Sequence, residues 1–541
     1  MLPADHSAYF SNVQCVCVTV VWSPQSALTI TNMSMEEYFS LLSTHCKDSG
    51  ATSKLLQDII VKLRALDEEA LQNNLSSSVS ALFSVWSDID EECIGLAAKV
   101  LHEMFTKCGV DLFVNNVSAS VFWGLKDGPP SLKEALLELI TTGFEANTVF
   151  VRNLPLHTLN SLLTAVVHCV ADENSLIGGK AQKLLVLIGK APKNISIVFK
   201  DPASVQLLRS MVMNNASLRI RFYDLMCSLI AVSEDLLELC IKEGFMDAML
   251  KEITSNDLLV QLNVIELLTD LILLSPSSMQ FLYSNNVLPV LHNSLTEAQA
   301  NPDGGLQHVA LVKFFGSFLG RYPKECLQAY PDFLQLIYSY VRFYDSLPIG
   351  LRLLAFDTIA LAASAPEGKR ILASQGAAMK EAMECLGRAI RNGTLDMRVR
   401  HLEALEKIFT VEDPTEMNEF SELLLDWFNS IYSQPTAQQL FSLIKAPFEA
   451  HQVAMYKVLR ALALFRWFPQ KIKEAEGFLD FLVSRAELST EAQHVKFELI
   501  QRLASNPDVK TAFSPTEQMK LTEYIRRGAM YYKAVPQFAM V

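Results

Sequence analysis

Several motifs that would carry chemistry are absent from this sequence. It has no glycine-rich phosphate-binding loop, no HExxH zinc motif, no EF-hand loop and no GxSxG nucleophile elbow. Its ten cysteines are scattered, mostly within apolar runs and without a CxxC pair, and its ten histidines are isolated from one another. We therefore expect no catalytic residues, no cofactor and no metal, and we expect the cysteines to be buried free thiols.

Long apolar segments and an excess of positive charge are absent as well. Residues 1–34 contain no Lys or Arg, and their apolar run Val13–Trp22 is too short for a membrane span and lacks the basic start of a secretory signal. We expect a poorly ordered extension ahead of Met35. The 46 basic and 59 acidic side chains give a net charge of −13, which repels a nucleic-acid backbone. These features predict a cytoplasmic protein, with access to the nucleus left open, that binds neither membranes nor nucleic acids.

The most informative feature present is a segment that recurs in register. Four aligned stretches place Pro192, Glu234, Pro276 and Pro366 in one column, the first three 42 residues apart and the last 90 residues further on. Each stretch has an apolar helical stripe, then a break, then a second apolar helix; the breaks are Pro202, Gly244, Asn286 and Gly376. A helical period of about 40 to 47 residues is typical of armadillo and HEAT repeats. We predict an all-α, armadillo- or HEAT-like solenoid, a right-handed superhelix that forms a single continuous domain.

The predicted domain organisation follows the regularity of this pattern. Residues 1–34 are the extension, 35–130 are atypical N-terminal repeats, 131–530 are armadillo- or HEAT-like repeats, and 531–541 are a C-terminal tail. The clearest helix start is predicted at Ser131, which caps the helix while Glu134 completes a capping box. The first helices of the regular repeats are expected to open near Asn174, Ser217, Asp257, Gly304, Leu347, Leu395, Pro447 and Ser489.

The second helix of each repeat is expected to line the concave side and to supply a binding surface. Counted from the break residue, apolar positions such as Phe245, Met246 and Met249 face the core. Later positions point outward and stack between repeats. We predict that they form a partner-binding ladder, with a solvated helix surface as the alternative. The ladder consists of Arg209, Lys251, Glu252, Asn293, Lys380 and Glu384.

Two groups of basic residues have two interpretations each. Arginines recur early in first helices, where they form either a peptide-binding row or bonds to the loop of the neighbouring repeat, and we favour the bonds. They are Arg219, Arg221, Arg352, Arg398 and Arg400. In the stretch Lys457–Lys473, alternating Arg, Phe and Trp are able to stack on bases. Because Leu459, Leu462 and Phe465 keep helical spacing, we favour a core helix there.

Four segments of the chain carry a resemblance to a known family. They are LVKFFGSFLGRYP, FSLIKAPFEAHQVAMYKVLRALA, HVKFELIQRLASN and YIRRGAMYYKAVP, at residues 311–323, 441–463, 494–506 and 524–536. Through the order of these segments the chain resembles the proteasome non-ATPase regulatory subunit five family, the S-five-b assembly chaperones, from about Met35 to Pro536. Residues 1–34 depart from the family, whose members begin close to the first helix.

The resemblance implies a non-catalytic assembly chaperone for the base of the proteasome regulatory particle. Such a chaperone holds a C-terminal domain of one AAA ATPase subunit, shares an intermediate with a second ATPase and the large scaffolding non-ATPase subunit, and leaves before the mature proteasome forms. We expect a monomer when the protein is free. The alternatives are another armadillo-type binding module, such as an Hsp70-class nucleotide-exchange factor, or a stable structural scaffold. A transport receptor is disfavoured, because the five Trp residues are out of register with the repeats.

Overall fold

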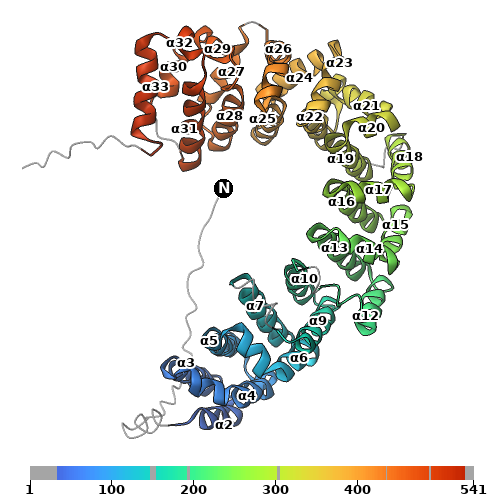
Figure 1. Cartoon of the computed structure of the whole chain (residues 1–541), viewed down its shortest axis with the longest axis vertical. Coiled ribbons are helices and arrows are strands. Elements are labelled where there is room, and N and C mark those ends of the chain that lie inside the picture. Colours follow the sequence, from blue (N-terminus) through green and yellow to red (C-terminus); the bar gives the residue numbers. More distant parts are fainter. Residues whose placement is uncertain are drawn as a thin grey trace, which may run out of the picture. The chain divides into compact units, whose positions relative to one another are not determined.

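The computed structural model describes residues 33–146, 154–191, 195–300, 305–433, 435–485 and 489–530, so the predicted C-terminal tail and nearly all of the predicted extension lie outside it. Within these ranges all regular elements are helices, which confirms the all-α repeat prediction. The chain separates into two compact units, Met1–Leu225 and Met226–Val541, and each is described by itself (Figure 1). The handedness of the superhelix and the single continuous domain stay predictions.

The first unit is built from two layers of helices. Helices α3, α5, α7 and α10 pack side by side in that order, and α2, α4, α6, α9 and α12 form a second layer against them (Figure 1). Helix α13, Ala216–Val232, begins in this unit. The bounds of the others are α2 Met35–His45, α3 Ser49–Ala65, α4 Glu68–Val85, η1 Trp86–Asp88, α5 Glu91–Asn116, α6 Ser118–Asp127, α7 Pro130–Ala146, α9 Leu156–Val170, α10 Ser175–Gly189 and α12 Pro202–Val212.

The second unit repeats the same two-layer plan. Helices α16, α19, α22, α25, α28 and α31 pack side by side, and we call them the inner row because they lie along the inner side of this unit's curve (Figure 1). The intervening elements form the outer layer.

The inner row comprises α16 Leu258–Leu274, α19 Gly305–Arg321, α22 Ile349–Ala363, α25 Leu395–Phe409, α28 Glu449–Leu462 and α31 Thr490–Ser505. The outer layer comprises α14 Asp235–Lys242, α15 Phe245–Lys251, η2 Glu252–Thr254, α17 Pro276–Ser284, α18 Val287–Ala300, α20 Pro323–Ala329, α21 Pro331–Arg342, η3 Tyr344–Ser346, α23 Pro366–Ser374, α24 Ala377–Asn392, α26 Pro414–Ser430, α27 Thr436–Ser442, η4 Leu443–Lys445, α29 Phe468–Glu474, α30 Phe478–Val483, α32 Val509–Ala512 and α33 Pro515–Arg527.

Several predicted helix starts are correct because their capping side chains work as expected. Asn174, Asp257 and Ser489 are the N-caps of α10, α16 and α31, and each side chain accepts a hydrogen bond from a backbone N–H of the first turn. A capping side chain satisfies backbone donors that have no partner within the helix. Short polar residues at the predicted period therefore mark where long helices begin.

The prediction for Ser131 is wrong. Helix α7 begins one residue earlier, at Pro130, and the carbonyl of Pro129 accepts from its first turn. The Ser131 hydroxyl instead accepts a hydrogen bond from the indole Nε1 of Trp86 at 3.0 Å, and the Glu134 carboxylate pairs with Lys180 at 2.8 Å. Both side chains bond partners from neighbouring repeats, and they therefore do not cap the helix.

The predicted breaks between paired helices are confirmed by backbone geometry. Gly244, Asn286 and Gly376 have φ angles of 74°, 55° and 52°. A positive φ costs little for glycine and is tolerated by asparagine, whose short side chain fits the left-handed conformation. Pro202 differs, since it lies in the first turn of α12 behind the N-cap Asp201. Past the breaks, the apolar stripe is buried as predicted, with Phe245, Met246 and Met249 all at most 2% exposed.

Buried thiols link repeats at a constant sequence separation. Cys93, Cys169 and Cys385 each donate to a backbone carbonyl 44 residues earlier, at Sγ–O distances of 3.4, 2.9 and 3.5 Å. Burial raises the pKa of Cys169 to about 12, so its sulfur stays protonated and able to donate. Each of these bonds joins a side chain of one repeat to the backbone of the repeat before it.

A close approach in the first unit depends on glycine. Gly178 on α10 faces the guanidinium of Arg221 so closely that a Cβ there would overlap it. Arg221 is nearly buried, and its Nη1 donates to the carbonyls of Val170 and Asp172 at 2.9 and 2.6 Å. These bonds tie α13 to the loop of the preceding repeat. The guanidinium cannot move without breaking them.

We expect Gly178→Ala to lower the free energy of unfolding by about 1–3 kcal/mol, because the new methyl group displaces Arg221 from its two carbonyls. Gly179→Ala is the matched control on the same helix, where a Cβ meets nothing within 4 Å. It should raise stability by about 0.5–1 kcal/mol through helix propensity. Urea unfolding followed by circular dichroism measures both, and equal effects of the two substitutions would contradict this account.

A buried histidine connects two repeats of the second unit. The hydroxyl of Tyr344 and Nε2 of His401 lie 2.6 Å apart, and His401 is 1% exposed. Burial first, and the nearby Arg400 second, lower the pKa of His401 to about 4. Nε2 of the neutral ring can therefore accept a hydrogen bond from the Tyr344 hydroxyl, whereas a protonated ring has no acceptor nitrogen.

This arrangement predicts a loss of stability in mild acid. The folded pKa of about 4 lies below the ordinary value of 6.5. The unfolded chain therefore binds the proton more tightly, and stability should fall by up to about 3 kcal/mol between pH 6.5 and pH 4. The double variant Tyr344→Phe with His401→Phe removes both polar partners. Its unfolding free energy, measured across the same pH range, should fall less than that of the parent protein, and parallel curves would rule out His401 as the cause.

Candidate protein-binding surfaces

Charged side chains pair across neighbouring helices along the inner row of the second unit. Lys313 on α19 pairs with Glu266 on α16, and both side chains are about half exposed. Arg400 on α25 pairs with Asp357 on α22 at 2.7 Å. Each pair joins two successive inner-row helices, so the charges are shared laterally along the surface.

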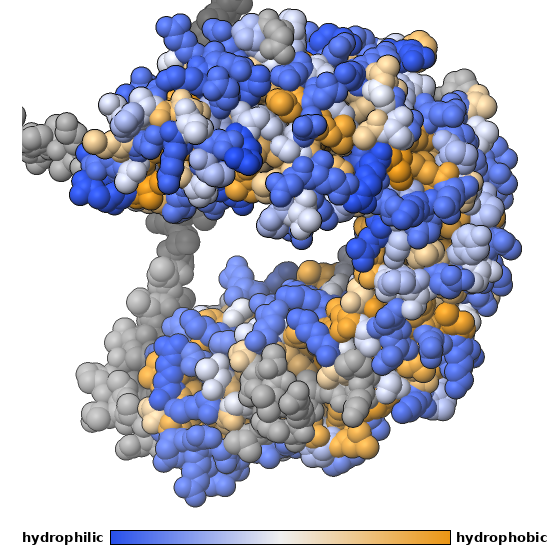
Figure 2. Space-filling model, turned by 45° about the horizontal axis from the view of Figure 1, so that its top comes forward, coloured by the Kyte–Doolittle hydropathy of each residue, from blue (hydrophilic) through white to orange (hydrophobic). Residues whose placement is uncertain are grey.

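Arg460 extends the same pattern over three helices. From α28 it reaches Glu406 on α25 at 3.2 Å and Glu498 on α31 at 2.5 Å. Exposed ion pairs contribute only about 0–1 kcal/mol each, so this arrangement defines the surface more than it stabilises the fold. The face of the molecule seen in Figure 2 is mostly hydrophilic, with hydrophobic residues in scattered patches. The inner row therefore exposes charges of both signs, together with apolar side chains such as Leu259 and Ile349.

The first unit shows a similar arrangement. Arg64 on α3 pairs with Glu103 on α5, and Lys180 on α10 reaches Glu134 and Glu138 on α7 at 2.8 and 2.9 Å. The hydrogen bond from Arg64 raises the pKa of its own guanidinium and lowers that of Glu103, which keeps both groups charged. Lateral pairing along the long helices is thus a property of both units.

The predicted ladder residues lie on other helices. Lys251 and Glu252 lie at the junction of α15 and η2, Asn293 on α18, and Lys380 and Glu384 on α24, all in the outer layer of the second unit. Arg209 lies on α12, in the second layer of the first unit. For the second unit, the assignment of second helices to the concave side is wrong, since the long first helices occupy the inner side (Figure 1).

The ladder residues come from separate elements of the two units. Lys380 forms an ion pair with Asp426 on α26 at 3.1 Å, with both side chains about half exposed. This pair is an outer-layer counterpart of the inner-row pairs. Partner binding by the ladder stays a prediction.

Three arginines of the first helices donate to backbone carbonyls of loops. Arg352 donates to two carbonyls of the turn before its own helix, at 2.7 Å each, and Arg398 donates to the carbonyl of Gly393 at 2.7 Å. Arg221 reaches the loop of the preceding repeat. The predicted bond to a neighbouring loop is therefore confirmed for Arg221, whereas Arg352 and Arg398 bond the turn before their own helix.

The basic and aromatic stretch Lys457–Lys473 is core, as favoured. Leu459, Leu462 and Phe465 are at most 1% exposed. Its cations face carboxylates: Arg466 pairs with Asp508 and Lys473 with Glu517, both at 2.9 Å. This pairing leaves little positive potential for a phosphate backbone.

The described residues offer few other kinds of site. No group of three or more His, Cys, Asp or Glu side chains there could hold a metal ion, and the eight cysteines in those ranges are free and buried. None of the described helices is by itself long and apolar enough to cross a membrane. Ile349–Ala363 and Pro366–Ser374 meet that test only together and are bent by 117°.

Two layers of helices, with bonds that recur about one repeat apart, define a helical-repeat protein with extended surfaces that carry charges of both signs. Within this class, the chain belongs to the proteasome non-ATPase 26S subunit family, whose model matches residues 36–541. It is 25% identical over 507 residues to the 26S proteasome non-ATPase regulatory subunit 5 of Bos taurus, covering 93% of this chain and 97% of the relative. The Homo sapiens protein of the same name is 24% identical, with 89% and 93% covered.

Solved structures support the fold alone. The karyopherin Kap121p in its complex with Ste12p has a TM-score of 0.61 at 13% identity over 93% of this chain. In its complex with the extreme C-terminus of the phosphatase Cdc14p, Kap121p has a TM-score of 0.56 at 15% identity over 92% of this chain. The alignments span 51% and 56% of those karyopherin chains.

Proposed function

We propose that this protein is a non-catalytic assembly chaperone for the base of the proteasome regulatory particle. It holds a C-terminal domain of one AAA ATPase subunit, in an intermediate with a second ATPase and the large scaffolding non-ATPase subunit, and it leaves before the mature proteasome forms. The observation that carries the proposal is the family match over residues 36–541. In this proposal the free protein is a cytoplasmic monomer, with access to the nucleus left open.

The inner row of the second unit is the surface that we propose for the ATPase domain. A standard protein interface buries about 800 Å² on each partner, and a row of long helices offers a continuous surface for a folded domain. Binding there exchanges existing ion pairs, such as Lys313 with Glu266, for pairs with the partner. Such an exchange gives little net electrostatic free energy but selects a complementary partner. A surface of this kind suits a protein that must release what it holds.

A pull-down from native lysate with the tagged full chain tests the proposal. Mass spectrometry should identify two proteasomal ATPases and the scaffolding subunit without core-particle subunits, and a native gel should show an intermediate smaller than the proteasome. Recovery of complete proteasomes would instead make the protein a stable scaffold subunit. Recovery of Hsp70-class chaperones, or of no proteasomal protein, would contradict the proposal.

A charge swap tests the inner row without removing an ion pair. Glu266→Lys combined with Lys313→Glu keeps the pair but exchanges its charges, so stability should change by less than about 1 kcal/mol. Capture of the ATPase should fall about tenfold, which corresponds to about 1.4 kcal/mol of binding free energy. Quantitative mass spectrometry of the pull-down measures this loss.

The matched control is the same exchange in the outer layer, Lys380→Asp with Asp426→Lys, at a pair of similar exposure. We expect it to leave capture unchanged. If the outer swap lowers capture and the inner swap does not, the ladder predicted from the sequence is the binding surface and the inner row is not.

A further inference from the structure

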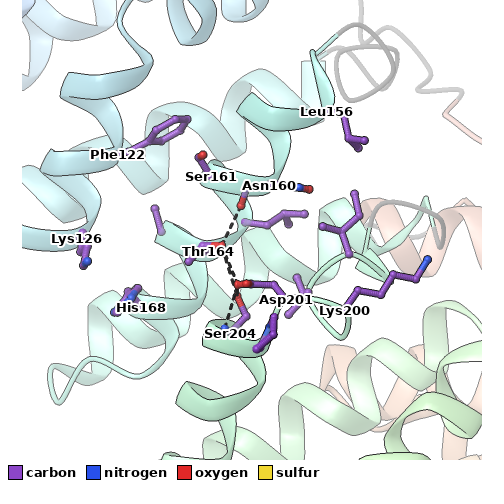
Figure 3. A pocket seen from close by; sticks show the side chains of 15 residues that line it. Phe122, Lys126, Leu156, Asn160, Ser161, Thr164, His168, Lys200, Asp201 and Ser204 are labelled. Carbon is purple, nitrogen blue, oxygen red and sulfur yellow. Dashed lines mark hydrogen bonds between the residues drawn. The ribbon is translucent and has the colours of Figure 1, made fainter.

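A groove of about 960 Å³ crosses the second layer of the first unit. Helix α9 forms its floor, α6 forms one wall, and the segment before α12 forms the other (Figure 3). The floor is low because the outward face of α9 carries the small polar residues Asn160, Ser161 and Thr164, while Phe122 and Ile197 line the walls. Its volume is at the upper end of the range of about 300–1,000 Å³ that is usual for ligand sites.

Apolar and basic side chains share the margins of this groove. Leu156 is 66% exposed at one edge, on the same side as Lys200, while Lys126 and His168 lie on the opposite side (Figure 3). Both lysines are exposed, and neither has an ion pair within the described residues. Other lysines of this unit do pair: Lys133, for example, lies 2.9 Å from Asp172.

The carboxylate that lines the groove is already engaged. Asp201 accepts hydrogen bonds from the Ser204 hydroxyl at 2.6 Å, the Ser204 backbone N–H at 3.0 Å and the Thr164 hydroxyl at 3.2 Å (Figure 3). These bonds, the Ser204 hydroxyl first, lower the pKa of Asp201 and fix the carboxylate as the cap of α12. Apart from this capping carboxylate, the groups that line the groove are cationic, polar or apolar.

His168 adds a donor rather than a charge. Burial first, and Lys126 second, lower its pKa below the ordinary 6.5, although Asp127 acts in the opposite sense and Lys133 reinforces the lowering. At neutral pH the ring is uncharged and offers one N–H. Positive potential in the groove then comes from the two lysines.

We propose that this groove binds an extended acidic peptide segment of a protein partner, with an apolar side chain of the peptide between Phe122 and Ile197 and carboxylates near Lys126 and Lys200. Charge complementarity selects the peptide, and the apolar walls anchor it. The site is separate from the inner row, which belongs to the other unit, so it goes beyond the proposed function and does not depend on it.

Fluorescence anisotropy with the full-length protein tests this proposal. The probe is a fluorescein-labelled hexapeptide, Asp-Glu-Phe-Leu-Glu-Asp. We expect a dissociation constant of about 10–100 μM, typical of a short segment that must be ordered on binding. Raising the ionic strength from about 0.1 M to about 1 M should weaken binding several-fold, because the Debye length falls from about 10 Å to about 3 Å.

Two variants test separately how the charge and the shape of the groove contribute to peptide binding. Lys126→Glu with Lys200→Glu reverses the charge of the rim, and Ser161→Trp fills the floor without changing charge. Each should weaken binding about tenfold or more. The control, Lys47→Glu with Lys99→Glu, makes the same change in net charge at exposed lysines of the same unit outside the groove and should change affinity less than about twofold. Circular dichroism confirms that all variants are folded.

Several results would overturn the proposal. They are a loss in the control equal to that in the groove variant, equal binding of a peptide with Lys in place of its acidic residues, and no binding at about 1 mM peptide. A concentration-dependent dimer that light scattering detects and Ser161→Trp abolishes would also overturn the proposal. The groove would then be occupied by a second copy of the chain.

Discussion

The structure depends on buried hydrogen bonds between groups one repeat apart. Three thiols donate to carbonyls 44 residues earlier, and the side-chain amide of Asn506 donates to the carbonyls of Ala463 and Phe465, 43 and 41 residues earlier. A helical repeat cannot bury its own flank, so its stability comes largely from its neighbours. Because leaving a buried polar group without a partner costs about 1–3 kcal/mol, these bonds specify the spacing at which repeats pack.

The ion pairs have similar sequence separations but a different role. Arg460 and Glu498 are 38 residues apart, and Lys313 and Glu266 are 47 apart, yet both pairs are partly or largely exposed. Solvent screening leaves each of them little stabilising free energy. The buried bonds therefore maintain the stacking, while the exposed pairs set the charge pattern that a partner meets. Selection of a partner and stability of the fold are controlled by different side chains.

Much of the local structure could be predicted from the sequence, because a 42-residue period places caps and breaks. Asp257 and Ser489 cap the expected helices, and Asn286 forms the expected break, with a positive φ. The prediction that Ser131 caps a helix failed because its hydroxyl accepts a hydrogen bond from the indole of Trp86, 45 residues away. The assignment of second helices to the concave side failed because both helices of a repeat bury an apolar stripe. Periodicity alone therefore does not show which helix lies on the inner side. The groove could not be foreseen, since its walls come from separate segments that meet only after folding.

Because the cysteines are spread along the chain, the reactivity of each thiol reports local unfolding near it. The thiolate is the reactive form, and burial raises the pKa of Cys169 and Cys240 to about 12, so the packed chain resists alkylating reagents. The described cysteines run from Cys46 to Cys385 and are shared between both units. When one repeat opens, its own thiol becomes reactive while the others stay protected. The alkylation pattern thus identifies an opened repeat that carries a thiol, whereas residues 258–300 and the chain beyond Cys385 contain no cysteine and leave no mark.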